Sequence, residues 1–181
     1  MQVRLTNYRP EWAKAFDQEV KLLTPLFMPN RVTFEHFGST SVPGMMAKPV
    51  IDIMGIVSDI RVVDVRIGSL CTLGYDAGGE WGIPGRRLFR KGGEDRTHHL
   101  HFYAVDNPEI YRHLMFRDYL RTHPNEVLHY SQQKQRWADQ YPDTREYSRA
   151  KHDFVSALEA RALTWGGLMY PARDGEIPEG R

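Results

Sequence analysis

The chain has 181 residues, of which 41% are hydrophobic and 12% aromatic, enough for one hydrophobic core but not for two independent domains. Lysine and arginine number 24 and aspartate and glutamate number 23, so a net charge of +1 supplies no global field that would attract nucleic acid or an anionic membrane. A single cysteine, Cys71, excludes an internal disulfide and a cysteine zinc cluster. No apolar run is long enough to span a membrane, so we expect a cytoplasmic protein without membrane or nucleic-acid partners, although a protein partner stays open.

The first part of the chain predicts two helices and two strands. Apolar residues recur at helical spacing after Pro10, which is tolerated in a first turn. Segments rich in Val, Ile and Phe predict strands, and the second of them is apolar enough to be central in a sheet. The expected elements are a helix from Trp12 to Phe27, strands at residues 32–37 and 49–57, and a helix at 59–73 that ends before Gly74.

A glycine-rich segment around Trp81 precedes a predicted β-hairpin. The pairs Gly78-Gly79 and Gly82-Gly85 bracket Trp81 and predict a flexible loop. Residues 87–90 and 98–105 predict two further strands, and residues 92–95 supply the turn between them.

From Pro108 onward, apolar residues fall in three helical stripes, with breaks at His123-Pro124 and Tyr141-Pro142. This pattern predicts three helices. Residues 166–181 are rich in glycine, proline and charge and predict a loose tail. We therefore predict one α+β domain over residues 1–165, with a mixed β-sheet, flanking helices and a C-terminal helical portion.

The turn between the first two predicted strands is a candidate phosphate-binding site. Glycine allows close approach of the backbone to an anion, and the three residues after it add hydroxyl donors. The candidate ligand-binding residues here are Gly38, Ser39, Thr40 and Ser41. Asp52 follows on the predicted central strand, and a carboxylate beside a phosphate turn can hold the metal of a nucleoside triphosphate. We expect a divalent metal (Mg, Mn or Zn) and a nucleoside triphosphate donor as cofactors.

Four motifs resemble those of a known family. They are Glu35-His36-Phe37-Gly38-Ser39-Thr40-Ser41-Val42-Pro43-Gly44, Ala47-Lys48-Pro49-Val50-Ile51-Asp52-Ile53, His99-Leu100-His101 and Phe116-Arg117-Asp118-Tyr119-Leu120-Arg121. Together they are similar to the GrpB family, within the nucleotidyltransferase (polymerase-beta-like) superfamily, and the similarity extends weakly to about Ala162. The resemblance implies a nucleotidyltransferase-like fold. A similar domain is fused to dephospho-CoA kinase in some bacteria.

This chain differs from the superfamily pattern at one of the expected metal ligands. The superfamily places two aspartates one residue apart after the Gly-Ser turn, and the matching positions here are Asp52 and Met54. A methionine cannot hold Mg²⁺, which demands oxygen ligands, and this argues against the two-metal form of nucleotidyl transfer. Asp52 could alternatively be a buried carboxylate that accepts backbone hydrogen bonds.

Two histidines are candidates to replace the missing carboxylate. His99 and His101 are two apart on a predicted strand and so face one side, and imidazole is both a transition-metal ligand and a general base. We predict that Asp52, His99 and His101 form a catalytic, metal-binding set, with Glu35 or His36 nearby. The alternative is that the two are ordinary strand histidines that hydrogen-bond a phosphate or another side chain. His98 should face the opposite way, toward the surface.

Several cations are candidates to bind a phosphate-containing ligand. They are Lys48, Arg117, Arg121 and Lys134. Arg117 and Arg121 are four apart on a predicted helix and share a face, where the alternative is a solvated face with local ion pairs. Lys134 interrupts an apolar stripe, and its head could reach either a cleft or solvent. Trp81 could stack on a base or fold back onto the core.

Three functions are consistent with these residues. The first is a metal-dependent nucleotidyltransferase that acts on a small molecule or protein side chain. The second is a non-catalytic module that binds a nucleotide or a CoA-like ligand. The third is a transition-metal hydrolase that uses Asp52, His99 and His101.

Overall fold

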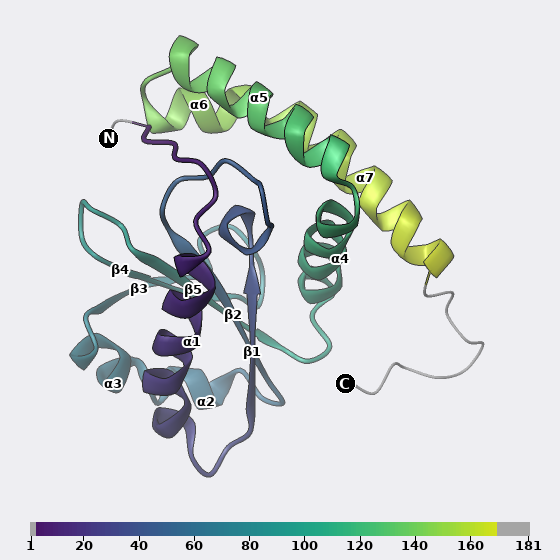
Figure 1. Ribbon diagram of the computed structural model, residues 1–181. Coiled ribbons are helices and arrows are strands. Elements are labelled where there is room, and N and C mark those ends of the chain that lie inside the picture. The colour runs from purple at the N-terminus through teal and green to yellow at the C-terminus, as the bar shows by residue number, and fades with distance from the viewer. Residues whose placement is uncertain (1–2, 170–181) are drawn as a thin grey trace.

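The fold is seen in a computed structural model, which describes residues 3–169 (Figure 1). The helices are α1 (Glu11–Leu23), α2 (Arg61–Asp64), α3 (Ile67–Thr72), α4 (Pro108–Thr122), α5 (Pro124–Gln140), α6 (Thr144–Ala150) and α7 (His152–Met169), with 3-10 turns η1 (Thr24–Phe27) and η2 (Ser39–Ser41). The strands are β1 (Val32–Phe37), β2 (Ile51–Val57), β3 (Tyr75–Gly79), β4 (Arg87–Lys91) and β5 (His98–Ala104). No helix among the described residues is long and apolar enough to cross a membrane.

The five strands form one mixed sheet in the order β1-β2-β5-β4-β3. β2 and β5 pair in parallel, and the other neighbours are antiparallel. β2 is therefore internal, as its apolar sequence predicts, and the β4–β5 hairpin closes at the expected glycine turn. The sheet and its helices confirm the predicted α+β class.

One face of the sheet packs against α1, α2 and α3 (Figure 1). The side chains of Ile51, Ile53 and Leu100 point to this face and meet Trp12 and Leu23 of α1. Each is almost fully buried, and burial of one such side chain contributes roughly 1.5–3 kcal/mol. This is the main core.

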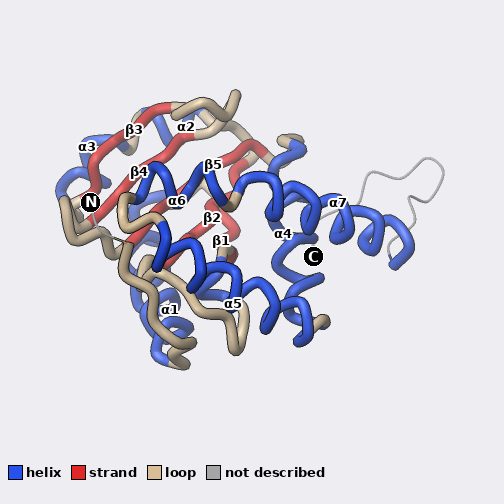
Figure 2. The backbone as a smooth tube through the Cα atoms, turned by 90° about the horizontal axis from the view of Figure 1, so that it is seen from above, coloured by secondary structure: helices blue, strands red, loops and turns tan. Residues whose placement is uncertain are grey.

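The opposite face carries the C-terminal helices, which lie over the strands in the view from above (Figure 2). α4 packs through Ile110 and Leu114 on Met54 and Tyr103, which cover one end of this face. A second apolar cluster joins α4, α5 and α7 to Met45 in the loop before β2. The helices α5 and α6 therefore stand over the other end of the face, where Asp52 lies.

Three element predictions need correction. The predicted helix at 59–73 is two short helices, because its β-branched residues and Gly68 form helix poorly and Arg66 between them donates to the Leu26 carbonyl oxygen at 2.7 Å. The predicted flexible segment includes β3, an edge strand that accommodates its glycines through a register shift between Ala77 and Gly79.

The third correction concerns the C-terminal helices. The structure has four of them between residues 108 and 169, since a break at Lys151 divides α6 from α7. The predicted domain boundary at 165 falls inside α7, so residues 166–169 are helical. The remainder of the predicted tail lies outside the described residues.

Candidate functional site

The backbone turn after β1 brings Ser39 beside Asp52. Gly38 adopts a φ of +69°, in the left-handed region, and a Cβ added there would overlap the Asp52 carboxylate. Glycine is required at this position because the chain must both reverse and pass against that carboxylate. Gly38 therefore makes the contact between the turn and β2 possible.

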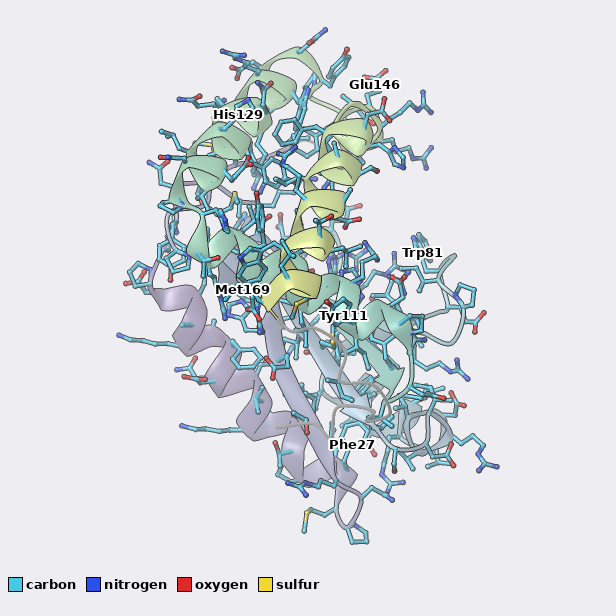
Figure 3. All side chains as sticks on the ribbon, turned by 90° about the vertical axis from the view of Figure 1, so that its right-hand side faces the viewer. Phe27, Trp81, Tyr111, His129, Glu146 and Met169 are labelled. Atoms are coloured by element: carbon cyan, nitrogen blue, oxygen red, sulfur yellow. The ribbon has the colours of Figure 1, made fainter. Side chains whose placement is uncertain are left out.

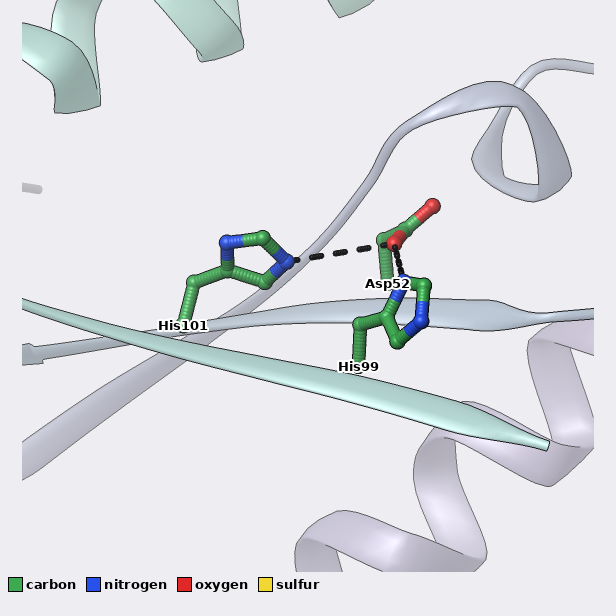
Figure 4. A group of neighbouring side chains, drawn as sticks. All are labelled: Asp52, His99 and His101. Carbon is green, nitrogen blue, oxygen red and sulfur yellow. Dashed lines mark hydrogen bonds and ion pairs between the residues drawn. The ribbon is translucent and has the colours of Figure 1, made fainter. Parts of the chain in front are cut away.

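Two histidines of β5 converge on the same carboxylate (Figure 4). His99 Nδ1 lies 3.1 Å from Asp52 Oδ1, and His101 Nε2 lies 3.9 Å from the same oxygen. The parallel register explains the convergence, because Asp52 is the direct neighbour of His99 and Met54 is the neighbour of His101. The backbone of His101 is next to Met54, but its side chain points along the strand toward Asp52.

Burial sets the protonation of this group. Burial lowers the pKa of His101 to about 3, which keeps its ring neutral near pH 7. Burial alone would raise the pKa of Asp52, but the hydrogen bond from His99 and the neighbouring histidines outweigh it and hold that pKa below its usual value. At neutral pH the group offers an ionised carboxylate and a neutral imidazole.

The three side chains fit a transition metal. Their candidate ligand atoms all lie within 4.8 Å of one another. In a tetrahedral site with metal–ligand bonds of about 2.0–2.1 Å, two ligand atoms lie about 3.4 Å apart, so the three side chains must close by up to about 1.4 Å around an ion. His101 Nε2 is buried and has no hydrogen-bond partner among the described residues, so it can bind a metal when the ring proton is on Nδ1. Two imidazoles and one carboxylate favour Zn²⁺, Mn²⁺ or Fe²⁺ over Mg²⁺.

The predicted neighbours do not join this group, although His36 is close enough to help lower the pKa of Asp52. Glu35 is bound by Arg117 at 2.7 Å. His36 packs on the α1 side of the sheet, stacked on Phe16 and 3.0 Å from Thr40 Oγ1, and burial lowers its pKa to about 4. His98 faces away from Asp52 as predicted, but it is not at the surface, since its side chain is 15% exposed and lies beside Glu19.

A cavity of about 590 Å³ opens from the Asp/His/His group toward the C-terminal helices. Its volume is in the range of small-molecule sites. The charged residues in its lining are Lys48, Asp52, Arg86, Arg90, Arg96, Lys134 and Lys151. Among the described residues that line it, Asp52 is the one carboxylate, so the cavity is strongly cationic although the whole chain is nearly neutral. Such a cavity favours an anionic ligand.

Lysines form one end of the cavity. Lys134 is 3% exposed, and its Nζ donates to Ser39 Oγ at 2.6 Å and to the Met46 carbonyl at 3.0 Å. The Nζ atoms of Lys48 and Lys151 lie 4.9 and 5.8 Å from the centroid of the Tyr147 ring. Burial lowers the pKa of all three lysines, which an anionic ligand would reverse. The apolar stripe of α5 therefore directs Lys134 into the cavity and not to solvent.

Arginines form the other end, and no local sequence pattern predicts them. Arg90 is the antiparallel neighbour of His99, on the same face of the sheet. Arg86 is 6% exposed, and its Nη1 lies 3.4 Å from His101 Nδ1. The signal that could have found Arg90 is the hairpin register, because the turn at residues 92–95 sets residue 90 opposite residue 99.

Other predicted binding residues do not line the cavity. Ser41 Oγ donates to the Gly38 carbonyl at 2.7 Å, and Arg121 Nε donates to the Ser41 carbonyl at 3.0 Å. Arg117 binds Glu35, Asp118 and the His36 carbonyl. Through these contacts both arginines stabilise the turn from outside the cavity. This agrees with the alternative interpretation of the two arginines, in which they form local ion pairs and do not bind a ligand.

Ser39, Thr40 and Lys48 do line the cavity, and their role in ligand binding stays a prediction. Thr40 Oγ1 donates to the Val50 carbonyl at 3.3 Å and so also holds the turn against the start of β2. Trp81 is 64% exposed at the rim, so it does not fold back onto the core.

The comparisons with known proteins agree on one family. The family model described as GrpB protein matches residues 2–161. The UPF0157 protein YqkA of Bacillus subtilis is 43% identical over 164 residues, which cover 90% of this chain and 48% of that protein. A UPF0157 protein of Streptomyces coelicolor is 32% identical, with 90% of this chain and 85% of that protein covered.

A solved structure is similar throughout. The crystal structure of conserved protein GrpB from Enterococcus faecalis superimposes with a TM-score of 0.85 at 41% identity, and covers 89% of this chain and 98% of that chain. The chain spans about half the length of the Bacillus subtilis relative and 65% of a Pseudomonas aeruginosa relative. The matched range and these relatives establish that the chain belongs to the GrpB family.

Proposed function

We propose that the protein is a metal-dependent nucleotidyltransferase, with Asp52, His99 and His101 as the metal-binding set and a nucleoside triphosphate as donor. The observation that carries the proposal is the placement of this set at the floor of a cavity whose other charged lining residues are all cationic among the described residues. A bound divalent metal would supply positive charge to the reacting phosphate oxygens.

The lysine end supplies the donor contacts. Lys134 is held by the Ser39 hydroxyl, and Lys48 and Lys151 carry charge into the same end, so the triphosphate can be bound beside Asp52. Charge-assisted hydrogen bonds to phosphate contribute roughly 1.5–3 kcal/mol each. In the reaction, an acceptor oxygen bonds to the α-phosphorus, the bond to pyrophosphate breaks, and the acceptor proton passes to solvent.

The histidines suit metal binding better than proton transfer. A base with the pKa of His101, about 3, is a weak proton acceptor at neutral pH, whereas its neutral Nε2 is suited to bind a cation. Arg86 Nη1 lies 3.4 Å from His101 Nδ1 and can only donate, so metal binding at Nε2 requires the ring proton on Nδ1 and a shift of Arg86. We therefore propose that both histidines and Asp52 are metal ligands.

The test is pyrophosphate release from each nucleoside triphosphate, with Mn²⁺ or Zn²⁺ and a pool of small-molecule acceptors. We expect release by the native chain and its loss in Asp52→Asn, with activity kept in the matched control Asp153→Asn, an exposed residue of α7. Nucleotide binding that is equal in the native chain and Asp52→Asn, without pyrophosphate release, would instead favour the non-catalytic binding module.

A second candidate is a transition-metal hydrolase of a phosphate ester. The observation that favours it is the ligand set itself, since two histidines and one carboxylate leave positions for water on Zn²⁺. The same assay separates the two functions. Hydrolysis gives free nucleotide or inorganic phosphate without an acceptor, whereas transfer requires one.

A further inference from the structure

The arginine end of the cavity has hydrogen-bonding groups without partners. Arg90 Nε and Arg96 Nη1 are buried and have no hydrogen-bond partner among the described residues. Both side chains line the cavity. Neither arginine has a carboxylate partner among the described residues, so two unpaired guanidinium groups that line one cavity are suited to bind an anionic ligand.

Arg90 lies apart from the lysine end. In register across the sheet, Asp52 on β2 is followed by His99 on β5 and Arg90 on β4. Neighbouring strands are about 4.8 Å apart, so Arg90 starts roughly 10 Å from Asp52. Ser39 and Lys134 lie on the other side of Asp52, beyond Gly38. The Asp/His/His group thus stands between two cationic ends.

Side-chain contacts hold the arginine end of the cavity in place. The guanidinium of Arg90 lies 4.5 Å from the centroid of the Trp81 ring, which holds its plane. Arg86 fixes the loop that carries Trp81, since its Nη2 donates to the Trp81 carbonyl at 2.8 Å and its Nε to the Glu80 carbonyl at 3.1 Å. Trp81 itself has a φ of +43°, a conformation that these contacts maintain. Figure 3 shows this loop at the edge of the molecule.

We propose that Arg90 and Arg96 bind an oxyanion, a carboxylate or phosphate group, of the acceptor substrate. Planar guanidinium groups match the geometry of both anions. The oxyanion site stands on its own contacts, while its assignment to the acceptor rests on the proposed function. With donor phosphates at the lysine end and the acceptor's anion at the arginine end, the two substrates meet at Asp52, His99 and His101.

The test locates selenate, an oxyanion whose selenium gives an anomalous signal, in crystals of the full chain. The chain carries ordinary methionine, and no metal is added. We expect selenate to give two anomalous peaks, one at the arginine end and one at the lysine end. In Arg90→Gln and Arg96→Gln, the first peak should be lost and the second kept. In solution, each substitution should weaken selenate binding at this end about tenfold, the effect of one charge-assisted hydrogen bond.

The control is Arg61→Gln, which removes an arginine whose side chain is 83% exposed and outside the cavity lining, and should leave both peaks. Malonate titration identifies the source of the anion, since tighter binding than selenate indicates a carboxylate acceptor and weaker binding a phosphate acceptor. Selenate at the lysine end alone, or native affinity in Arg90→Gln and Arg96→Gln, would overturn the proposal. Selenate bound at the arginine end in a chain that releases no pyrophosphate would end the proposed function and leave the oxyanion site intact.

Discussion

Gly38 packs directly against Asp52, because the Asp52 carboxylate occupies the space that a side chain at residue 38 would need. This contact joins the two parts of the candidate site, the Ser39 turn and the aspartate that His99 and His101 approach. It makes Gly38→Ala a probe of the whole arrangement.

We expect Gly38→Ala to lower the free energy of unfolding by more than Gly44→Ala, and to weaken Zn²⁺ binding. Both glycines have positive φ, +69° and +79°, so both substitutions carry backbone strain of about 1–3 kcal/mol. Only at Gly38 does the new Cβ also displace Asp52, since the nearest atom to a Cβ at Gly44 is 3.8 Å away, in Val127. Urea unfolding and zinc titration measure the two effects. Equal losses in both variants would contradict the contact.

Lys134 should matter for phosphate binding. We expect Lys134→Met to weaken nucleoside triphosphate binding about tenfold or more, because it removes a charge-assisted contact beside Ser39. The control is Lys14→Met on α1, where the lysine is exposed. Isothermal titration of both variants gives the ratio, and native affinity in Lys134→Met would exclude the lysine end as the triphosphate site.

Arg117, in contrast, should matter for stability. Its side chain is 10% exposed and binds Glu35 and Asp118, both at 2.7 Å. Arg117→Gln leaves the partly buried Glu35 without its arginine and Asp118 with only its longer contact to Arg121, at 3.8 Å, which should cost about 2–4 kcal/mol in the free energy of unfolding. Triphosphate affinity, measured well below the melting temperature, should be unchanged. A large loss of affinity without a loss of stability would return Arg117 to the ligand-binding residues.

The free energy of unfolding should fall as the pH drops below 6.5. Burial lowers the pKa of His113 to about 4, so the unfolded chain binds a proton at its ordinary pKa of 6.5 whereas the folded chain does so only near pH 4. Stability from this group is complete above pH 6.5 and lost progressively toward pH 4, by about 2 kcal/mol at pH 5. Urea unfolding at pH 7 and pH 5 measures the change, and His113→Phe should reduce it. A pH dependence identical in the native chain and the variant would contradict the assignment.

The sequence predicted the β-sheet and the Asp/His/His group well, because both follow from local patterns. A strand period of two places His99 and His101 on one face, and the Gly38 turn brings Ser39 to Asp52. The arginine end was missed, since Arg90 and Arg96 join the site only through the hairpin register and the loop fold. Arg117 and Arg121 share a helix face as predicted, but which partner that face meets depends on tertiary packing.

The proposed metal site is tested most directly by a crystal of the native chain grown with Zn²⁺ and measured on both sides of the zinc absorption edge. We expect one zinc peak bonded to Asp52, His99 and His101, with ligand distances of about 2.0–2.2 Å. The peak should be absent in Asp52→Asn and present in Asp153→Asn, whose side chain is exposed on α7. Zinc bound only at other residues, or no zinc at a concentration that saturates ordinary protein sites, would contradict the account.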